Sequence, residues 1–210
     1  MRTLSRIFGA WAWSIVLIAG AAVASASDHT ILVFGDSLSA AYGLRPEQGW
    51  VALLDKRLKT QGYGYELVNA SISGETTSGG AQRLARALSL HKPGIVVLEL
   101  GANDGLRALP VEIIRGNLEK MVALAKQSGA RVLLVGMRIP PNYGPRYTTD
   151  FMQMYHQLAT KESLRLVPFL LESVALDPSR MQGDGMHPNA SGEPYVLDTL
   201  WPQLEPMLKK

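Results

Sequence analysis

Short apolar runs alternate with longer amphipathic segments along most of this chain. The runs are rich in valine, isoleucine and leucine and have the length of β-strands. They cover residues 30–34, 65–70, 95–100, 131–135 and 164–169. The run at 95–100 is apolar on both faces except at Glu99, which is the pattern of a strand that helices cover on both sides.

Between these runs, apolar residues recur at helical spacing, and turn residues bound several of the segments. The pattern predicts helices over residues 46–62, 81–90, 111–128, 149–163 and 189–208. Helical connections of this length permit parallel strand pairing. We therefore predict an α/β fold with three layers, α/β/α, around a flavodoxin-like five-stranded parallel sheet. Such a fold hosts many functions, so it does not identify one by itself.

The first residues have the features of a signal peptide. Arg2 and Arg6 precede an apolar stretch at residues 7–23, and Ala24-Ser25-Ala26 is a small-x-small cleavage site. An uncleaved anchor is the alternative, since the stretch approaches the roughly 17–25 residues of a spanning helix. We predict cleavage of residues 1–26, no stable membrane anchor afterwards, and one domain over residues 27–210. Its expected location is the periplasm, with secretion as an alternative.

Charge and cysteine content exclude some classes of protein. The formal net charge is +3, and removal of Arg2 and Arg6 with the leader lowers it to about +1. Charged residues are dispersed and form no basic cluster with aromatic neighbours, so no nucleic-acid partner is expected. The chain has no cysteine, which excludes disulfides and leaves stability to the core. We expect a monomer without a cofactor.

Candidate chemistry lies at the strand ends, where open α/β sheets bind ligands. Ser37 follows the first run, Gly74 lies in the loop after the second, and Asn103 follows the third. Asp184 and His187 stand together just before the last predicted helix. A nucleophile, oxyanion donors and a base held by an acid are the groups that acyl transfer requires.

Most of these residues, taken singly, also fit ordinary turns. Glycine permits a turn at Gly74, and Asn103 and Asp184 stand in sequences that commonly form turns. His187 has no comparable role in a turn. The remaining histidines, His29, His91 and His156, are predicted to be structural or on the surface.

Four blocks of sequence resemble those of the SGNH (GDSL) hydrolases, in the same order and across the whole predicted mature chain. The blocks are Gly35-Asp36-Ser37-Leu38-Ser39, Gly74, Gly101-Ala102-Asn103-Asp104 and Asp184-x-x-His187-Pro188. Within that family, the chain is similar to the periplasmic bacterial esterases that also act as thioesterases and lysophospholipases. The serine is not in the Gly-x-Ser-x-Gly elbow of α/β-hydrolases.

The resemblance implies a role for each block. Ser37 would be the nucleophile, His187 its base, and Asp184 the group that orients the imidazole. The oxyanion would be bound by the backbone N–H groups of Ser37 and Gly74 and by the side-chain amide of Asn103.

The expected function is that of an exported serine esterase, acting on acyl esters and thioesters such as aryl esters, acyl-CoA-type thioesters and lysophospholipids. Apolar residues close to the presumed site favour an acyl chain: Leu106, Leu109, Met137, Ile139, Pro140, Tyr143 and Tyr147. A carbohydrate-ester deacetylase is the alternative enzyme, and an inactive ligand-binding domain is a further one. A metal site made of Asp36, Asp184 and His187 lacks the usual spacing of metal ligands, and we expect no metal.

Overall fold

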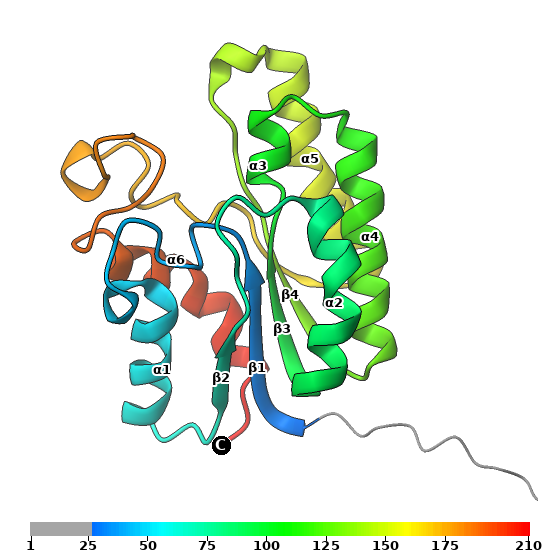
Figure 1. The fold of residues 1–210 in the computed structure, drawn as a ribbon, viewed down its shortest axis with the longest axis vertical. Helices are drawn as coiled ribbons and strands as arrows, with labels where there is room; N and C mark the ends of the chain where they lie inside the picture. The colour runs from blue at the N-terminus through cyan, green and yellow to red at the C-terminus, as the bar shows by residue number, and fades with distance from the viewer. Residues whose placement is uncertain (1–26) are drawn as a thin grey trace, which may run out of the picture.

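A computed structural model describes residues 27–210, and the predicted signal peptide at residues 1–26 lies outside the described residues. Five strands form one parallel sheet in the order β2-β1-β3-β4-β5 (Figure 1). The strands are β1 (Ser27–Gly35), β2 (Glu66–Asn69), β3 (Pro93–Glu99), β4 (Arg131–Val135) and β5 (Arg165–Val167). This is the strand order of flavodoxin-like folds, so the predicted fold class is confirmed.

Helices cover both faces of the sheet. They are α1 (Trp50–Thr60), α2 (Thr77–His91), α3 (Ala102–Leu106), α4 (Val111–Gln127), α5 (Pro145–Glu162) and α6 (Glu193–Leu204). Figure 1 shows α1 and α6 against one face, and α2, α4 and α5 against the other. Short 3₁₀ turns occur at Pro46–Gln48, Pro141–Tyr143, Pro178–Arg180 and Glu205–Met207. None of the helices within residues 27–210 is long and apolar enough to cross a membrane.

The core lies between the sheet and its two helical layers. Every residue of β3 is buried, as the pattern at residues 95–100 predicted for a covered central strand. On α4, the buried residues Ile114, Leu118, Met121, Val122 and Ala125 follow helical spacing and form one stripe. Burial of such stripes against the sheet fixes the layers.

Some predicted boundaries were wrong, because side-chain contacts set them. The predicted helix at 46–62 divides at Gly49, and α1 begins at Trp50. The backbone N–H of Trp50 donates to the Glu193 carboxylate at 2.7 Å. The helix predicted from residue 81 begins at Thr77, because the Thr76 hydroxyl caps it by accepting from the Gly79 N–H. Pro93 opens β3 instead of ending the previous segment.

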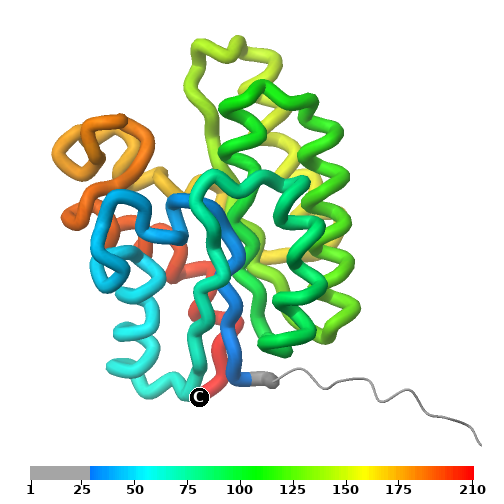
Figure 2. The backbone as a smooth tube through the Cα atoms, viewed as in Figure 1, coloured from blue at the N-terminus to red at the C-terminus, as the bar shows by residue number. Residues whose placement is uncertain are grey.

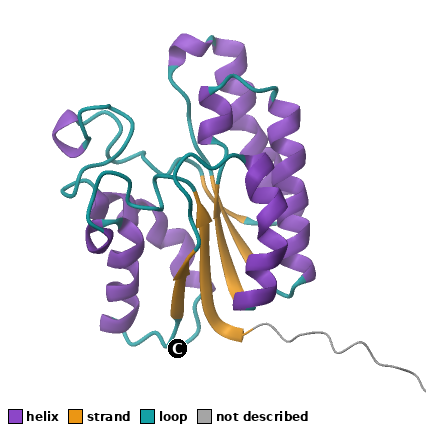
Figure 3. Ribbon diagram, in the orientation of Figure 1, coloured by secondary structure: helices purple, strands orange, loops and turns teal. Residues whose placement is uncertain are grey.

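Loops gather at the carboxyl edge of the sheet. Figure 3 shows them clustered at one end of the strands, where α/β sheets carry their sites. In Figure 2 the blue segment after β1 and the orange segment that precedes α6 lie side by side. The Gln182 side chain joins the two segments by donating to the Tyr42 carbonyl at 2.8 Å. The fold thus brings the Ser37 and His187 segments together.

Candidate active site

Ser37 stands in a tight turn directly after β1. The Asp36 N–H donates to Glu99 Oε2 at 3.2 Å, and the Leu38 N–H donates to Asp36 Oδ1 at 3.1 Å. Gly35 permits this turn, because a Cβ there would lie 2.4 Å from Glu99 Oε2. The Glu99 side chain, which interrupts an otherwise apolar strand, therefore anchors the turn that presents Ser37.

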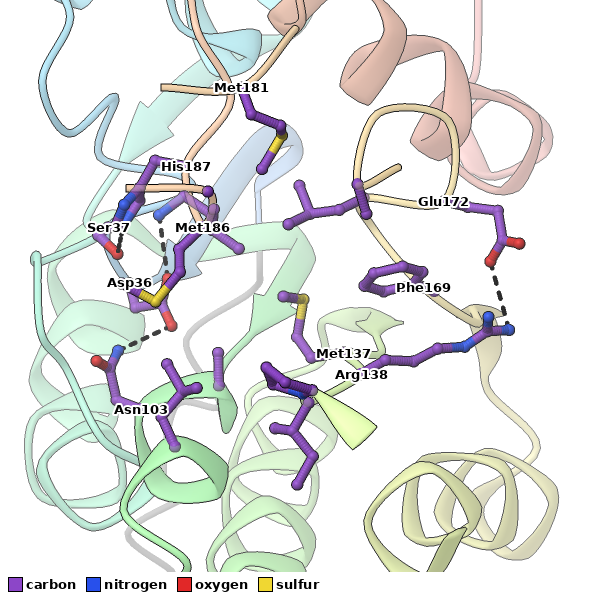
Figure 4. Close-up of a pocket in the computed structure, with 18 of the residues that line it drawn as sticks. Asp36, Ser37, Asn103, Met137, Arg138, Phe169, Glu172, Met181, Met186 and His187 are labelled. Atoms are coloured by element: carbon purple, nitrogen blue, oxygen red, sulfur yellow. Dashed lines mark hydrogen bonds and ion pairs between the residues drawn. The ribbon is translucent and has the colours of Figure 1, made fainter. Parts of the chain in front are cut away.

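A chain of hydrogen bonds links Ser37 to the loop before α6. The Ser37 hydroxyl lies 2.8 Å from His187 Nε2, and His187 Nδ1 lies 2.7 Å from Asp184 Oδ2 (Figure 4 shows Ser37 and His187). These are the contacts that a nucleophile, a base and an orienting acid require. The structure thus brings together three residues that stand up to 150 positions apart.

The electrostatic environment keeps Asp184 ionised. Burial opposes ionisation, but hydrogen bonds from the N–H groups of His187 and Met186 and from the imidazole outweigh it, and the pKa falls to about 2. Both N–H groups donate to Oδ1, which leaves Oδ2 for the His187 ring. The carboxylate can therefore orient the ring and stabilise an imidazolium.

The predicted backbone donors lie in the turn after β1 and in the loop after β2. Among residues 27–210, neither the Ser37 N–H nor the Gly74 N–H donates to a protein acceptor. Gly74 is exposed, and its φ of +78° is one that glycine adopts without strain. The Ile72 N–H donates to the Gly35 carbonyl at 3.1 Å, so this loop is fastened to the end of β1.

Asn103 lies in the first turn of α3 and faces Asp36. Its Nδ2 donates to Asp36 Oδ2 at 3.1 Å and to the Glu75 carbonyl at 3.0 Å (Figure 4 shows the first bond). The turn alternative at this position was wrong, since Asn103, Asp104 and Gly105 are helical. The buried Asp104 carboxylate accepts from the N–H and the hydroxyl of Thr77, which fixes α3 to the start of α2.

An apolar cavity of about 450 Å³ opens beside Ser37 and His187. In Figure 4 it extends from these residues past Met137 and Phe169 to Arg138 and Glu172, whose side chains pair at 3.4 Å. Most of its wall is aliphatic, aromatic or thioether: Leu38, Ala102, Leu106, Met137, Ile139, Pro140, Phe169, Leu171, Ala175, Leu176, Met181 and Met186.

Only part of this wall was predicted from the sequence. Leu106, Met137, Ile139 and Pro140 line the cavity as expected, but Leu109, Tyr143 and Tyr147 do not. The Tyr143 hydroxyl instead donates to the carbonyl of Leu106, the last residue of α3, and the Tyr147 hydroxyl donates to the carbonyl of Leu109. The missed residues come mainly from the segment at 169–176, which shows no regular apolar period, and from the neighbours of His187.

The other candidate groups lie elsewhere. Residues 27–210 contain no group of three or more His, Asp or Glu side chains that could hold a metal ion. His29 is exposed and its ring lies 5.5 Å from that of Tyr65. His91 and His156 are helical residues of α2 and α5 and do not line the cavity.

Comparison with known proteins places the chain in a family of enzymes. The sequence profile of the GDSL-like Lipase/Acylhydrolase family matches residues 33–193. The chain belongs to this family. It is therefore classed among the enzymes that hydrolyse carboxylic esters.

Individual relatives cover nearly the whole chain. Esterase TesA of Pseudomonas aeruginosa is 50% identical over 183 residues, which are 87% of this chain and 91% of the relative. Thioesterase 1/protease 1/lysophospholipase L1 of Escherichia coli is 39% identical over 88% of this chain and 87% of its own. The solved structure of the esterase EstA from Pseudoalteromonas sp., inhibited by monoethylphosphonate, is 40% identical with a TM-score of 0.82, over 85% of this chain and 97% of EstA.

Proposed function

We propose that this chain is an exported serine esterase that hydrolyses acyl esters and thioesters through a Ser37–His187–Asp184 triad and an acyl-enzyme intermediate. The observation that carries the proposal is the chain of hydrogen bonds from Ser37 Oγ through His187 to Asp184. Ser37 and His187 line an apolar cavity. Family membership supports the reaction class, and the leader-like residues 1–26 support export to the periplasm.

The first half-reaction forms the acyl-enzyme. Ser37 Oγ attacks the acyl carbonyl carbon while His187 Nε2 takes the hydroxyl proton, and Asp184 stabilises the imidazolium. The carbonyl oxygen becomes an oxyanion, which accepts hydrogen bonds from the N–H groups of Ser37 and Gly74 and from the Asn103 amide. When the tetrahedral intermediate collapses, the bond to the alcohol or thiol breaks, and the leaving group takes the proton from His187.

The second half-reaction releases the acyl group. His187 takes a proton from water, the resulting hydroxide attacks the acyl carbon, and the bond to Ser37 Oγ breaks as the proton returns to that oxygen. The triad thereby ends in its starting protonation state, and the product is a carboxylic acid. No cofactor enters this sequence of steps.

The cavity supports an acyl chain as the recognised part of the substrate. Its wall is mainly apolar, and each buried CH₂ of a chain gains about 0.8 kcal/mol. Aryl esters, acyl-CoA-type thioesters and lysophospholipids all offer such a chain beside a reactive carbonyl. A carbohydrate-ester deacetylase would need a polar cleft for its sugar, so this wall disfavours that alternative.

Labelling with a fluorophosphonate tests the nucleophile. We expect the purified residues 27–210 to gain one phosphonyl group at Ser37, to lose activity in parallel, and to be insensitive to EDTA. Labelling that persists in Ser37→Ala, or activity abolished by EDTA, contradicts the triad. A panel of aryl esters, acyl-CoAs and lysophospholipids of graded chain length then defines the substrate class.

A further inference from the structure

Asp36 is buried beside the nucleophile but has no part in the proton transfers described above. Only 1% of its surface is exposed, and it precedes Ser37 directly in the chain. Its Oδ1 accepts from the Leu38 N–H, and its Oδ2 accepts from Asn103 Nδ2. The carboxylate thus connects the turn that carries the nucleophile to the side chain proposed as an oxyanion donor.

In the resting site, both hydrogens of the Asn103 amide are used within the protein. Nδ2 donates to Asp36 Oδ2 at 3.1 Å and to the Glu75 carbonyl at 3.0 Å. A carboxylate and a carbonyl can only accept, so they hold the nitrogen end of the amide in place. Figure 4 shows this nitrogen on the side of Asp36 and the amide oxygen turned away from it.

An oxyanion needs an N–H from the same nitrogen, so substrate must take over one of these two hydrogen bonds. The Glu75 carbonyl belongs to the loop backbone, and the Arg83 guanidinium holds that loop through the Glu75 side chain. The bond to Asp36 joins two side chains at the edge of the cavity, since both residues line it. The Asp36 bond is therefore the one that can be exchanged without moving the backbone.

We propose that Asp36 is a positioning residue for the Asn103 oxyanion donor. Its carboxylate turns the amide nitrogen toward the nucleophile in the resting enzyme and yields the N–H to the oxyanion as the tetrahedral intermediate forms. The inference rests on the proposed function, because it requires Asn103 to bind the oxyanion.

The Asp36 carboxylate is shielded from solvent, so it acts mainly on the protein groups that contact it. Burial raises its pKa to about 6, against the opposing effects of the Leu38 N–H, His187 and the Asn103 amide, and Asp104 adds to the rise. The Glu99 carboxylate accepts from the Asp36 N–H and from the Ser39 hydroxyl, so it holds the Asp36 backbone and not the Asn103 amide. Because Asn103 Nδ2 donates to Asp36 Oδ2, loss of the Asp36 carboxylate should release the Asn103 amide.

A double-mutant cycle tests the proposal, with Asp36→Asn and Asp36→Ala each made in the parent and in Asn103→Ala. Asp36→Asn keeps the shape but offers one acceptor oxygen in place of two. In the parent, we expect either change to lower kcat by roughly 10-fold with little change in KM, which is less than the roughly 10²–10³ expected for loss of a whole oxyanion donor. In Asn103→Ala the same change should lower kcat by less than about 3-fold, because the amide that Asp36 positions is absent.

Equal costs in both backgrounds overturn the inference, because Asp36 would then act by another route, such as its charge near His187. An Asn103→Ala enzyme with unchanged kcat contradicts the role of Asn103 in the proposed function, which is a separate result. The rate constant for phosphonylation of Ser37 provides a second readout in the same cycle. The Asp36 substitutions should lower this rate constant more in the parent than in Asn103→Ala. An equal reduction in both backgrounds overturns the inference.

Glu193→Gln is the matched control for a lost buried carboxylate. Glu193 also accepts a backbone N–H, that of Trp50, but it does not line the cavity. The kcat of Glu193→Gln should equal that of the parent. Thermal unfolding of each variant shows whether it is folded, and Asp36→Asn is the variant to use if Asp36→Ala does not fold.

Discussion

The guanidinium of Arg83 forms an ion pair with the carboxylate of Glu75 across the base of the loop that carries Gly74. The same guanidinium donates to the Ala70 carbonyl at 2.7 Å, so one side chain holds both ends of the loop at 70–75. It also lies 3.8 Å from the centre of the Phe34 ring, on the strand that leads to Ser37. Arg83 therefore contacts both the loop that carries Gly74 and the strand that leads to Ser37.

Replacement of Arg83 by lysine should lower kcat. Lysine keeps the charge but lacks the planar fork that reaches Ala70 and Glu75 together. If Gly74 binds the oxyanion, a looser loop should cost about 10-fold in kcat at nearly constant KM, since small misplacements of catalytic groups are costly. Steady-state kinetics on a short aryl ester measures this, and Arg86→Lys, an exposed position on the same helix, is the control. A lower Tm with unchanged kcat would make Arg83 purely structural.

Replacement of Asn103 by alanine should lower kcat by roughly 10²–10³ with KM little changed, because the lost N–H acts mainly in the transition state. Asn103→Asp should fall at least as far, since a carboxylate has the same shape but cannot donate to an oxyanion. Kinetics on an aryl ester, with Tm measured in parallel, separates this effect from loss of folding. A variant that keeps kcat but loses stability would show that Asn103 serves only α3.

The layers of the fold could be predicted because they depend on local pattern. Strands appear as apolar runs, and the long helical connections between them indicate parallel pairing. The exact start of α1 could not be predicted, because the carboxylate that holds the Trp50 N–H stands 143 residues away at Glu193. Glu99 was visible as an exception in its strand, but its partners on Asp36 and Ser39 required the three-dimensional structure.

The site divides in the same way. The blocks around Ser37, Asn103 and His187 identified the candidate catalytic groups through their resemblance to those of the SGNH hydrolases. The first two follow strands directly, whereas β5 ends at Val167, well before His187. The residues of the cavity wall were harder to predict, because a sequence does not show which way a loop side chain points. Tyr143 and Tyr147 were expected in the wall, but they do not line the cavity, and their hydroxyls donate to the carbonyls of Leu106 and Leu109.

Phe169 should influence the preference for acyl chain length. Its ring lies in the cavity wall beyond Met137, as seen from the triad (Figure 4). Phe169→Ala should reduce kcat/KM for long acyl chains by about 10-fold, which is the contribution of roughly two buried CH₂ groups. Esters with acetyl groups should be nearly unaffected, because they do not reach the ring. Kinetics on a series of p-nitrophenyl esters measures the difference.

Tyr143→Phe is the control for that series. It removes only the hydroxyl that donates to the Leu106 carbonyl, and Tyr143 does not line the cavity. Its effect on kcat/KM should be the same factor at every chain length. If Phe169→Ala also reduces all substrates equally, the acyl chain binds elsewhere.

Glu193 should make the stability of the protein depend on pH. Burial raises its pKa from 4.5 to about 7, and the hydrogen bond from the Trp50 N–H only partly offsets the rise. Between these two values the folded state binds more protons than the unfolded state, so stability falls as pH rises from about 4.5 to about 7. Above that range the contribution is constant and unfavourable, because the folded protein holds a buried charge.

Glu193→Gln should remove this part of the pH dependence. The glutamine oxygen can still accept from the Trp50 N–H, but no charge is buried, so the variant should gain stability relative to the parent as pH rises. The gain should be on the order of 1–3 kcal/mol at pH 8 and should vanish near pH 4. Urea unfolding of both proteins across this range measures the difference, in which the contributions of Asp36 and Glu99 cancel. A difference that does not change with pH would show that Glu193 titrates alike in the folded and unfolded states.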